Sequence, residues 1–159
     1  MPDCLHVPED QKRFRAALAN ADVTILGREG HERHPANGRS RLVLTTRVDT
    51  VELREEGGST VVYWNPGGVS LQRALTPFGG DGPERTAAIA GGTRVMTALL
   101  PVTDRFDLVV ASDCAIPDGR PCLTGAPSIQ AIEEQLQAAG LLARPPEPLG
   151  TATLRVWQR

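Results

Sequence analysis

Short apolar segments that end in glycine or in polar residues are the sequence feature that most constrains how this chain folds. Three of them cover residues 22–26, 41–46 and 86–90. Apolar centres of this length are typical of strands that are covered on both faces of a parallel sheet. Helical spacing and turn residues lie between them, so strands and helices alternate along most of the chain. This order predicts an α/β fold, a three-layer sandwich with a mostly parallel central sheet and an antiparallel C-terminal strand at 151–157.

The helical segments carry their own start and stop signals. Pro8 and the acidic residues after it predict the start of a first helix, because proline and acids suit a first turn. The spacing of Phe14, Ala17 and Leu18 predicts a buried face on this helix. A second amphipathic pattern, late in the chain, is expected to end at Gly140.

Length and composition predict a single globular domain over residues 1–159. Apolar residues make up 40% of the chain and charged residues 23%, the balance of a folded protein. A net charge of −2 leaves no basic field for a nucleic acid, and no apolar stretch reaches the roughly 20 residues that span a membrane. Cys4, Cys114 and Cys122 show no paired spacing, so we expect three reduced thiols in a cytoplasmic protein.

The sharpest local motif is a pair of glycines between an apolar strand and the helix expected after it. Backbone N–H groups at a helix start are unpaired, and two glycines remove the side chains that would block a phosphate. We therefore expect this turn to bind the phosphates of a dinucleotide; a plain tight turn is the alternative that the motif alone leaves open. The residues concerned are Gly91, Gly92, Thr93, Arg94 and Val95.

Two other strand ends offer groups that suit further phosphates. Thr45, Thr46 and Arg47 end the second apolar segment, where two hydroxyls and a guanidinium suit the 2′-phosphate that distinguishes NADPH from NADH. Gly27 and Arg28 close the first segment in the same manner. Ligands of α/β sheets bind at the carboxyl ends of strands, so we expect these residues to contact the same cofactor. A solvated strand end is the alternative interpretation.

These motifs occur in a particular order along the chain. They are Ile25–Arg28, Gly38-Arg39, Leu42–Thr46 and Ala90–Val95, preceded by the helix pattern Pro8-x-Asp10-x-x-x-Phe14-Arg15. Their order and spacing resemble dihydrofolate reductase and the related reductase domain of bacterial riboflavin biosynthesis. The resemblance extends from about residue 5 to residue 111, with the closing strand at 151–159.

The resemblance implies an NADPH-dependent reductase that acts on a small pteridine-like or pyrimidine-like heterocycle, with the hydride supplied by the cofactor. It implies that Asp10 hydrogen-bonds the heterocycle and promotes its protonation. Phe14 would pack on the ring, and Arg39 would hold a substrate carboxylate. It also implies a cis peptide bond between Gly91 and Gly92. The plainer alternatives are a first-turn acid for Asp10, a core residue for Phe14 and a surface arginine for Arg39.

The sequence also departs from the family pattern. The family begins with a central strand and a loop over the nicotinamide, and this chain begins after both. We expect another segment, a partner subunit in a homodimer, or further chain to supply that strand, because its neighbours otherwise expose unpaired ladder groups. Gly30, Met96 and Val109 stand where the family uses a hydroxyl residue, a tyrosine and a threonine. The alternative function is a catalytically degenerate module that keeps the fold and binds a nucleotide or another protein.

His31 and His34 are the remaining candidates for chemistry. Their spacing matches no standard metal site, so no metal is expected, and we interpret them as surface residues of a polar loop.

Overall fold

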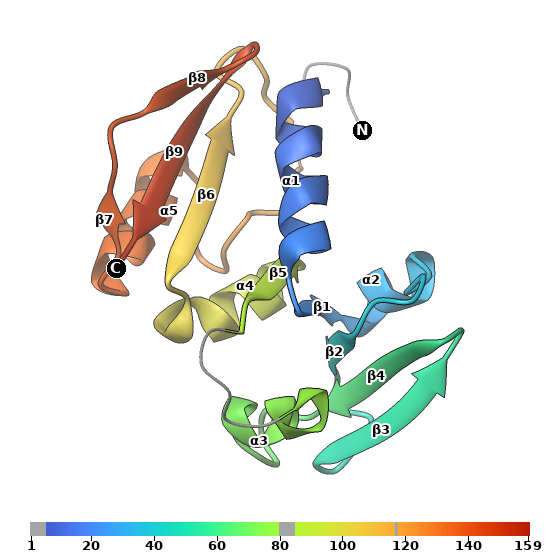
Figure 1. The fold of residues 1–159 in the computed structure, drawn as a ribbon. Coiled ribbons are helices and arrows are strands. Elements are labelled where there is room, and N and C mark those ends of the chain that lie inside the picture. Colours follow the sequence, from blue (N-terminus) through green and yellow to red (C-terminus); the bar gives the residue numbers. More distant parts are fainter. Residues whose placement is uncertain (1–5, 80–84, 117) are drawn as a thin grey trace. The chain divides into compact units, whose positions relative to one another are not determined.

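The structure, a computed structural model, describes residues 6–79, 85–116 and 118–159. Its helices and strands belong to two compact units (Figure 1). The parallel-sheet unit comprises residues 17–95. The antiparallel-sheet unit comprises the segment up to Ala16 together with Met96–Arg159. The expectation of one domain over residues 1–159 stays a prediction.

The parallel-sheet unit is built on a five-stranded sheet in the order β3-β4-β2-β1-β5. Neighbouring strands β4, β2, β1 and β5 run parallel, and only β3 is antiparallel to its neighbour. The apolar segments 22–26 and 41–46 form the inner strands β1 and β2, as predicted, whereas segment 86–90 forms the edge strand β5 and is only partly buried. The strands are β1 (Val23–Gly27), β2 (Arg41–Leu44), β3 (Val51–Glu56), β4 (Ser59–Trp64) and β5 (Ala87–Gly91).

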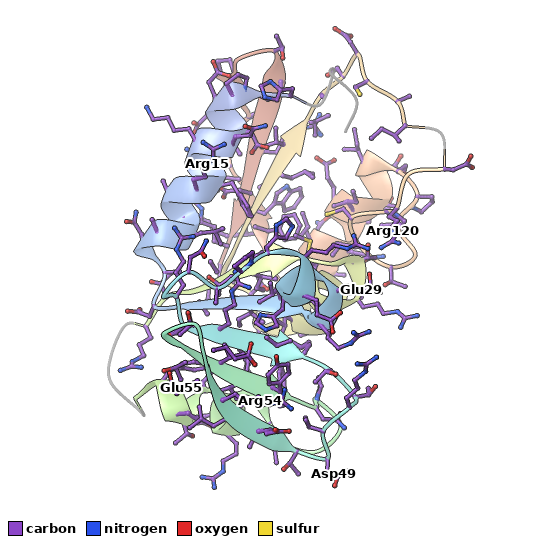
Figure 2. The ribbon with its side chains drawn as sticks, turned by 90° about the vertical axis from the view of Figure 1, so that its right-hand side faces the viewer. Arg15, Glu29, Asp49, Arg54, Glu55 and Arg120 are labelled. Carbon is purple, nitrogen blue, oxygen red and sulfur yellow. The ribbon has the colours of Figure 1, made fainter. Side chains whose placement is uncertain are left out.

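The core of this unit explains why the central strands lack alternation. Leu42, Val43, Val61 and Val62 are fully buried at successive positions of β2 and β4, so both faces of these strands are covered. The outer strand β3 differs, because it carries exposed charged side chains such as Arg54, labelled in Figure 2. Polar residues on an edge strand discourage pairing with other chains.

Short helices and a tight hairpin complete the parallel-sheet unit. Gly57 and Gly58 connect β3 and β4 with φ values of 57° and 74°, the conformation that two-residue hairpins require. The Ser70 hydroxyl accepts from the backbone N–H of Arg73 at 3.3 Å and caps α3, as its position predicts. Helix α2 packs against β1 and β2. The helices are α2 (Arg28–Arg33), α3 (Leu71–Leu75) and the 3-10 turn Thr76–Phe78.

The antiparallel-sheet unit contains a separate sheet in the order β6-β9-β7, with β8 also paired to β9. Helix α5 begins after Ser128, whose hydroxyl accepts from the Ala131 N–H at 3.1 Å. It ends at Ala138, two residues before Gly140, which has a φ of 85° and follows the C-cap. Buried Leu136, Leu141 and other apolar residues form its core. The elements are α5 (Ile129–Ala138), β6 (Arg105–Val110), β7 (Leu142–Ala143), β8 (Glu147–Leu149) and β9 (Ala152–Gln158).

Two further helices were expected from the sequence, and both form. One of them, however, lacks the buried face that was predicted for it. Helix α1 (Pro8–Asn20) begins at the predicted proline, and α4 (Thr93–Leu99) follows the glycine pair before the 3-10 turn Leu100–Val102. However, no residue of α1 is buried, and Phe14 is 47% exposed. The prediction of a buried face was wrong, because helical spacing of apolar residues does not specify what covers them.

The predicted fold class, an α/β protein with a mostly parallel sheet and an antiparallel C-terminal strand, is confirmed. The structure adds that this C-terminal strand pairs within a sheet of its own. No helix in the described part of the chain has the length and apolar character needed to span a bilayer.

The cysteines differ from their prediction. Cys114 is disulfide-bonded and Cys122 is a free thiol, so the expectation of three reduced thiols was wrong. Cys4 lies outside the described residues.

β5 and β6 are two of the strands that have a free lateral edge. Among the described strands, β5 pairs only with β1, and β6 pairs only with β9. Successive backbone groups of a strand point alternately to its two sides, so each of these strands has groups without a sheet partner. The sequence predicts unpaired backbone N–H and C=O groups on the strand at 86–90 if the first strand of the family does not pair with it.

Candidate cofactor-binding edge and acidic site

Three neighbouring parallel strands end level with one another in the parallel-sheet unit. β1 lies between β2 and β5, and the register pairs Gly27 with Leu44 and Leu26 with Gly91. The residues that follow these positions therefore meet at one edge, the place where ligands bind in α/β sheets. We call it the strand-end edge; it consists of Gly27, Arg28, Thr45, Thr46, Arg47, Gly91, Gly92, Thr93 and Arg94.

The glycine turn of this edge has a backbone that favours glycine. Gly91 and Gly92 have φ values of 118° and 93°. The described residues contain no cis peptide bond, so the expected cis bond between these glycines was wrong; the turn is made by positive φ angles instead. A Cβ on Gly27 would lie 3.4 Å from Val95 Cγ2, and one on Gly92 would lie 3.6 Å from it. Val95, which is 5% exposed, packs under both glycines rather than lying open to a ligand.

The end of β2 presents its polar residues through a small turn. The backbone N–H of Thr45 donates to the Trp64 carbonyl at 2.9 Å and continues the sheet by one bond. The Thr45 hydroxyl accepts from the backbone N–H of Arg47 at 3.1 Å. Thr46 and Arg47 are exposed beyond this turn. The structure thus brings the predicted hydroxyls and guanidinium to the edge, with one hydroxyl used to shape it.

The three arginines of the edge differ in how their charge is used. Arg28 forms an ion pair with Glu32 one turn along α2, with 2.5 Å between Nη1 and Oε1. Arg47 and Arg94 are exposed, and neither forms an ion pair among the described residues. The edge therefore offers two cationic side chains that are available to an anion.

Asp10 lies in the first turn of α1, in the antiparallel-sheet unit, and is half-buried. The sequence left open whether burial or favourable charges would dominate its pKa. Burial is the largest influence and raises the pKa; the nearby Asp107 carboxylate raises it further, while Arg13 opposes both. The net effect is a raised pKa, which favours the protonated carboxyl.

Asp107, on β6, is a neighbour of Asp10 that the sequence analysis missed. It accepts from Arg13 Nη2 at 2.9 Å and from Arg105 Nε at 2.7 Å. Burial raises the pKa of Asp107, but the two arginines outweigh burial and leave it below its ordinary value. One carboxyl with a raised pKa thus lies beside one that is held charged, and such divergent pairs are common where acid–base chemistry is performed.

The two predicted substrate residues occupy different surroundings. Phe14 lies one helical turn after Asp10 on α1 and is exposed. Arg39 is exposed in the turn before β2, whereas Thr45 follows the opposite end of that strand. Arg39 therefore does not belong to the strand-end edge. The roles of Asp10, Phe14 and Arg39 toward a substrate stay predictions.

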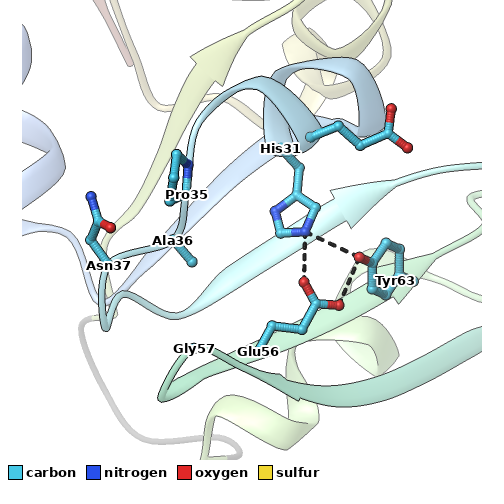
Figure 3. Close-up of a pocket in the computed structure, with 8 residues that line it drawn as sticks. His31, Pro35, Ala36, Asn37, Glu56, Gly57 and Tyr63 are labelled. Atoms are coloured by element: carbon cyan, nitrogen blue, oxygen red, sulfur yellow. Dashed lines mark hydrogen bonds and ion pairs between the residues drawn. The ribbon is translucent and has the colours of Figure 1, made fainter.

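A second polar cluster, which the sequence analysis did not predict, lies in the parallel-sheet unit. His31 belongs to α2, and its side chain is only 9% exposed, so its interpretation as a loop residue on the surface was wrong. It contacts Glu56 of β3 and Tyr63 of β4 (Figure 3). It also contacts Arg41 of β2. Residues so far apart in sequence give no local motif. Among the described residues, no group of three or more metal-ligating side chains is present.

Comparisons with known proteins place the fold. No family model and no curated protein matches the sequence, but solved structures match the fold, which is dihydrofolate reductase-like. One is dihydrofolate reductase from Enterococcus faecalis, complexed with NADP(H) and RAB-propyl. It is 20% identical with a TM-score of 0.56, and the match covers 97% of this chain and 83% of that one.

A second match is a putative riboflavin biosynthesis protein from Shewanella sp. PV-4. It is 17% identical with a TM-score of 0.58, and the match covers 99% of this chain and 87% of that one. Both folds were expected from the resemblance of the sequence motifs. At these identities the comparisons confirm the fold alone.

Proposed function

We propose that this protein is an NADPH-dependent reductase of a pteridine-like or pyrimidine-like heterocycle. The observation that carries the proposal is the level ending of β1, β2 and β5, where glycine backbone and exposed arginines occupy one edge of the parallel sheet. The reductase-like fold supports it, and one structure of this fold was determined with NADP(H).

The residues of the strand-end edge fit a dinucleotide phosphate. Gly92 is exposed and presents no side chain, so a phosphate can approach the backbone closely. Arg47 and Arg94 supply positive charge for the pyrophosphate or for the 2′-phosphate of NADPH. We assign Arg47 to the 2′-phosphate, because the Thr45 turn holds it at the end of a strand next to β1.

Asp10 is the proposed proton donor to the heterocycle. When bound, NADPH supplies the hydride, and the substrate then needs a proton. The raised pKa of Asp10 keeps more of this carboxyl protonated than an ordinary aspartate would be, and Asp107 beside it holds negative charge. The proposal predicts that Asp10→Asn leaves NADPH binding unchanged and abolishes turnover of a dihydropteridine.

Titration of the cofactor fluorescence of NADPH with the protein tests the binding step. We expect saturable binding that Gly92→Ala weakens by about tenfold or more, because a Cβ enters the phosphate path and φ is strained there. Gly38→Ala is the matched control: its φ is 79° and a Cβ would meet nothing within 4 Å. Absence of binding at high micromolar NADPH, or equal weakening by both variants, contradicts the proposal.

A degenerate nucleotide-binding module is the second candidate. It is favoured by the free edge of β5, since the strand expected there belongs to the nicotinamide side of the family fold. NADPH binding without turnover of any dihydropteridine identifies this candidate. A homodimer that supplies a strand to β5, and a cytoplasmic location, stay predictions of the sequence.

A further inference from the structure

A pocket of about 470 Å³ lies in the parallel-sheet unit, away from the strand-end edge. It is bordered by α2, by the turn before β2 and by the end of β3, with His31, Glu32, Asn37, Glu56 and Tyr63 in its wall (Figure 3). We call it the His31 pocket. Its volume is within the range of small-molecule sites. The strand-end edge begins after the opposite end of β2.

Arg41 determines which nitrogen of His31 carries the hydrogen. Arg41 Nη1 lies 3.1 Å from His31 Nδ1. A guanidinium has only donors, so Nδ1 must accept, and the neutral ring carries its hydrogen on Nε2. Arg41 is itself buried and donates to the carbonyl oxygens of His34 and Pro35. These bonds hold its guanidinium in place beside His31.

The polar hydrogens of His31 and Tyr63 then converge on one carboxylate. His31 Nε2 donates to Glu56 Oε2 at 3.0 Å, and the Tyr63 hydroxyl donates to Glu56 Oε1 at 2.8 Å. The Tyr63 oxygen lies 3.1 Å from the same His31 nitrogen and can only accept there. Once these bonds are made, His31 has no hydrogen-bond donor left. Glu56 and Tyr63 can still accept further hydrogen bonds.

The charge of Glu56 is maintained by the same contacts. Burial is the largest influence and raises the pKa of Glu56, but hydrogen bonds from Tyr63 and His31 together with nearby positive charge, including that of Arg54, outweigh burial and leave the pKa lowered. The Arg54 guanidinium lies 4.5 Å from the centre of the Tyr63 ring and covers one of its faces. A ligand in the His31 pocket therefore meets Glu56 as an anionic acceptor.

We propose that the His31 pocket binds a small organic cation through a primary ammonium or guanidinium group that donates to Glu56, with Glu32, one oxygen of which is already paired with Arg28, as a second carboxylate at the wall. Donor-rich cations match the accepting capacity that remains on Glu56 and Tyr63, and a carboxylate bonds a guanidinium well through two parallel hydrogen bonds. This site is separate from the proposed cofactor edge, and its ligand differs from a dinucleotide in the sign of its charge.

Amide chemical shifts of the full chain, followed by NMR during titration with butylguanidinium and butylammonium, test the proposal. We expect saturable shifts at Asn37, Gly57 and Tyr63 with either cation and none with butyrate. Acetyl-arginine amide then distinguishes a free small cation from an arginine side chain of a peptide: binding by either probe supports the site, and the tighter probe identifies the source.

Variants of neighbouring carboxylates make the test specific. Glu56→Gln is expected to weaken butylguanidinium binding about tenfold or more, the effect of losing a hydrogen bond to a charged group. Glu55→Gln is the matched control, since Glu55 precedes Glu56 on β3 and binds Thr60 instead (Figure 2). Glu32→Gln, at an exposed position, is expected to weaken binding several-fold and keeps the test decisive if Glu56→Gln does not fold.

Two results overturn the proposal. One is the absence of saturable shifts with both cations at millimolar concentration. The other is equal affinity of Glu56→Gln, or of Glu32→Gln, and the unaltered protein. Neither outcome bears on NADPH binding, so the two proposals fail independently.

Discussion

The strand-end edge and the His31 pocket belong to the same sheet unit but present opposite groups to a ligand. At the edge, glycine backbone and two exposed arginines offer hydrogen-bond donors and positive charge. In the pocket, the donors of His31 and Tyr63 are used within the protein, and the Glu56 carboxylate is left to accept. The difference shows that the identity of nearby residues does not determine what a site binds. The ligand is determined by the donors and acceptors that remain free after the internal hydrogen bonds are made.

The largest expected effect comes from removing the support that both regions share. Strand β2 has Arg41 at its start and Thr45 after its end, and Leu42 between them is fully buried. We expect Leu42→Ala to lower the free energy of unfolding by about 2–5 kcal/mol, because a cavity remains in the core. Urea denaturation measures this loss. Leu53→Ala, at a position 57% exposed on β3, is the control, and an equal loss in both contradicts the described core.

A smaller effect separates the two regions by charge. Arg47→Ala is expected to raise the dissociation constant for NADPH about tenfold to a hundredfold, as for the loss of a charged hydrogen bond, and to leave NADH binding nearly unchanged. Fluorescence titration with each cofactor measures the ratio. Arg33→Ala is the control, since Arg33 is an exposed arginine on α2, outside the edge. If Arg47→Ala weakened the binding of NADPH and NADH equally, Arg47 would not bind the 2′-phosphate.

The smallest effect concerns pH and the pocket. The pKa of Glu56 is lowered in the folded protein, so its contribution to stability is present above the unfolded pKa and is lost as pH falls through the folded value. Because the side chain is 34% exposed, we expect this contribution to be about 1 kcal/mol or less. Glu56→Gln should flatten the acid side of the stability profile. If Glu55→Gln flattens it equally, the effect does not come from the pocket.

Much of the fold was predictable because local sequence patterns determine many of its strands and helix ends. The apolar centres of β1 and β2 predict covered strands, and Gly140 predicts the end of a helix. The strand-end edge was predictable for the same reason, because polar residues directly follow each strand. Helix α1 was the exception, since spacing identifies an apolar face without saying what covers it.

The rest of the site depends on contacts between distant segments. Asp107 is 94 residues from Arg13, and His31 is 32 residues from Tyr63, so no local motif announces either cluster. His31 was interpreted as a surface residue because its partners come from three different strands. Likewise, the pairing of β9 with β6 and β8 follows from register, which single segments do not specify.

The position of NADPH on the protein is the most direct test of the central claim. Amide chemical shifts recorded as NADPH is added should change at Gly27, Thr45 and Gly92, and they should saturate with the same dissociation constant as the fluorescence titration. The His31 pocket should remain unaffected in the same spectra. Shifts confined to Asn37, Gly57 and Tyr63, or no saturable shift at the strand-end edge, would contradict the assignment of this edge to the cofactor.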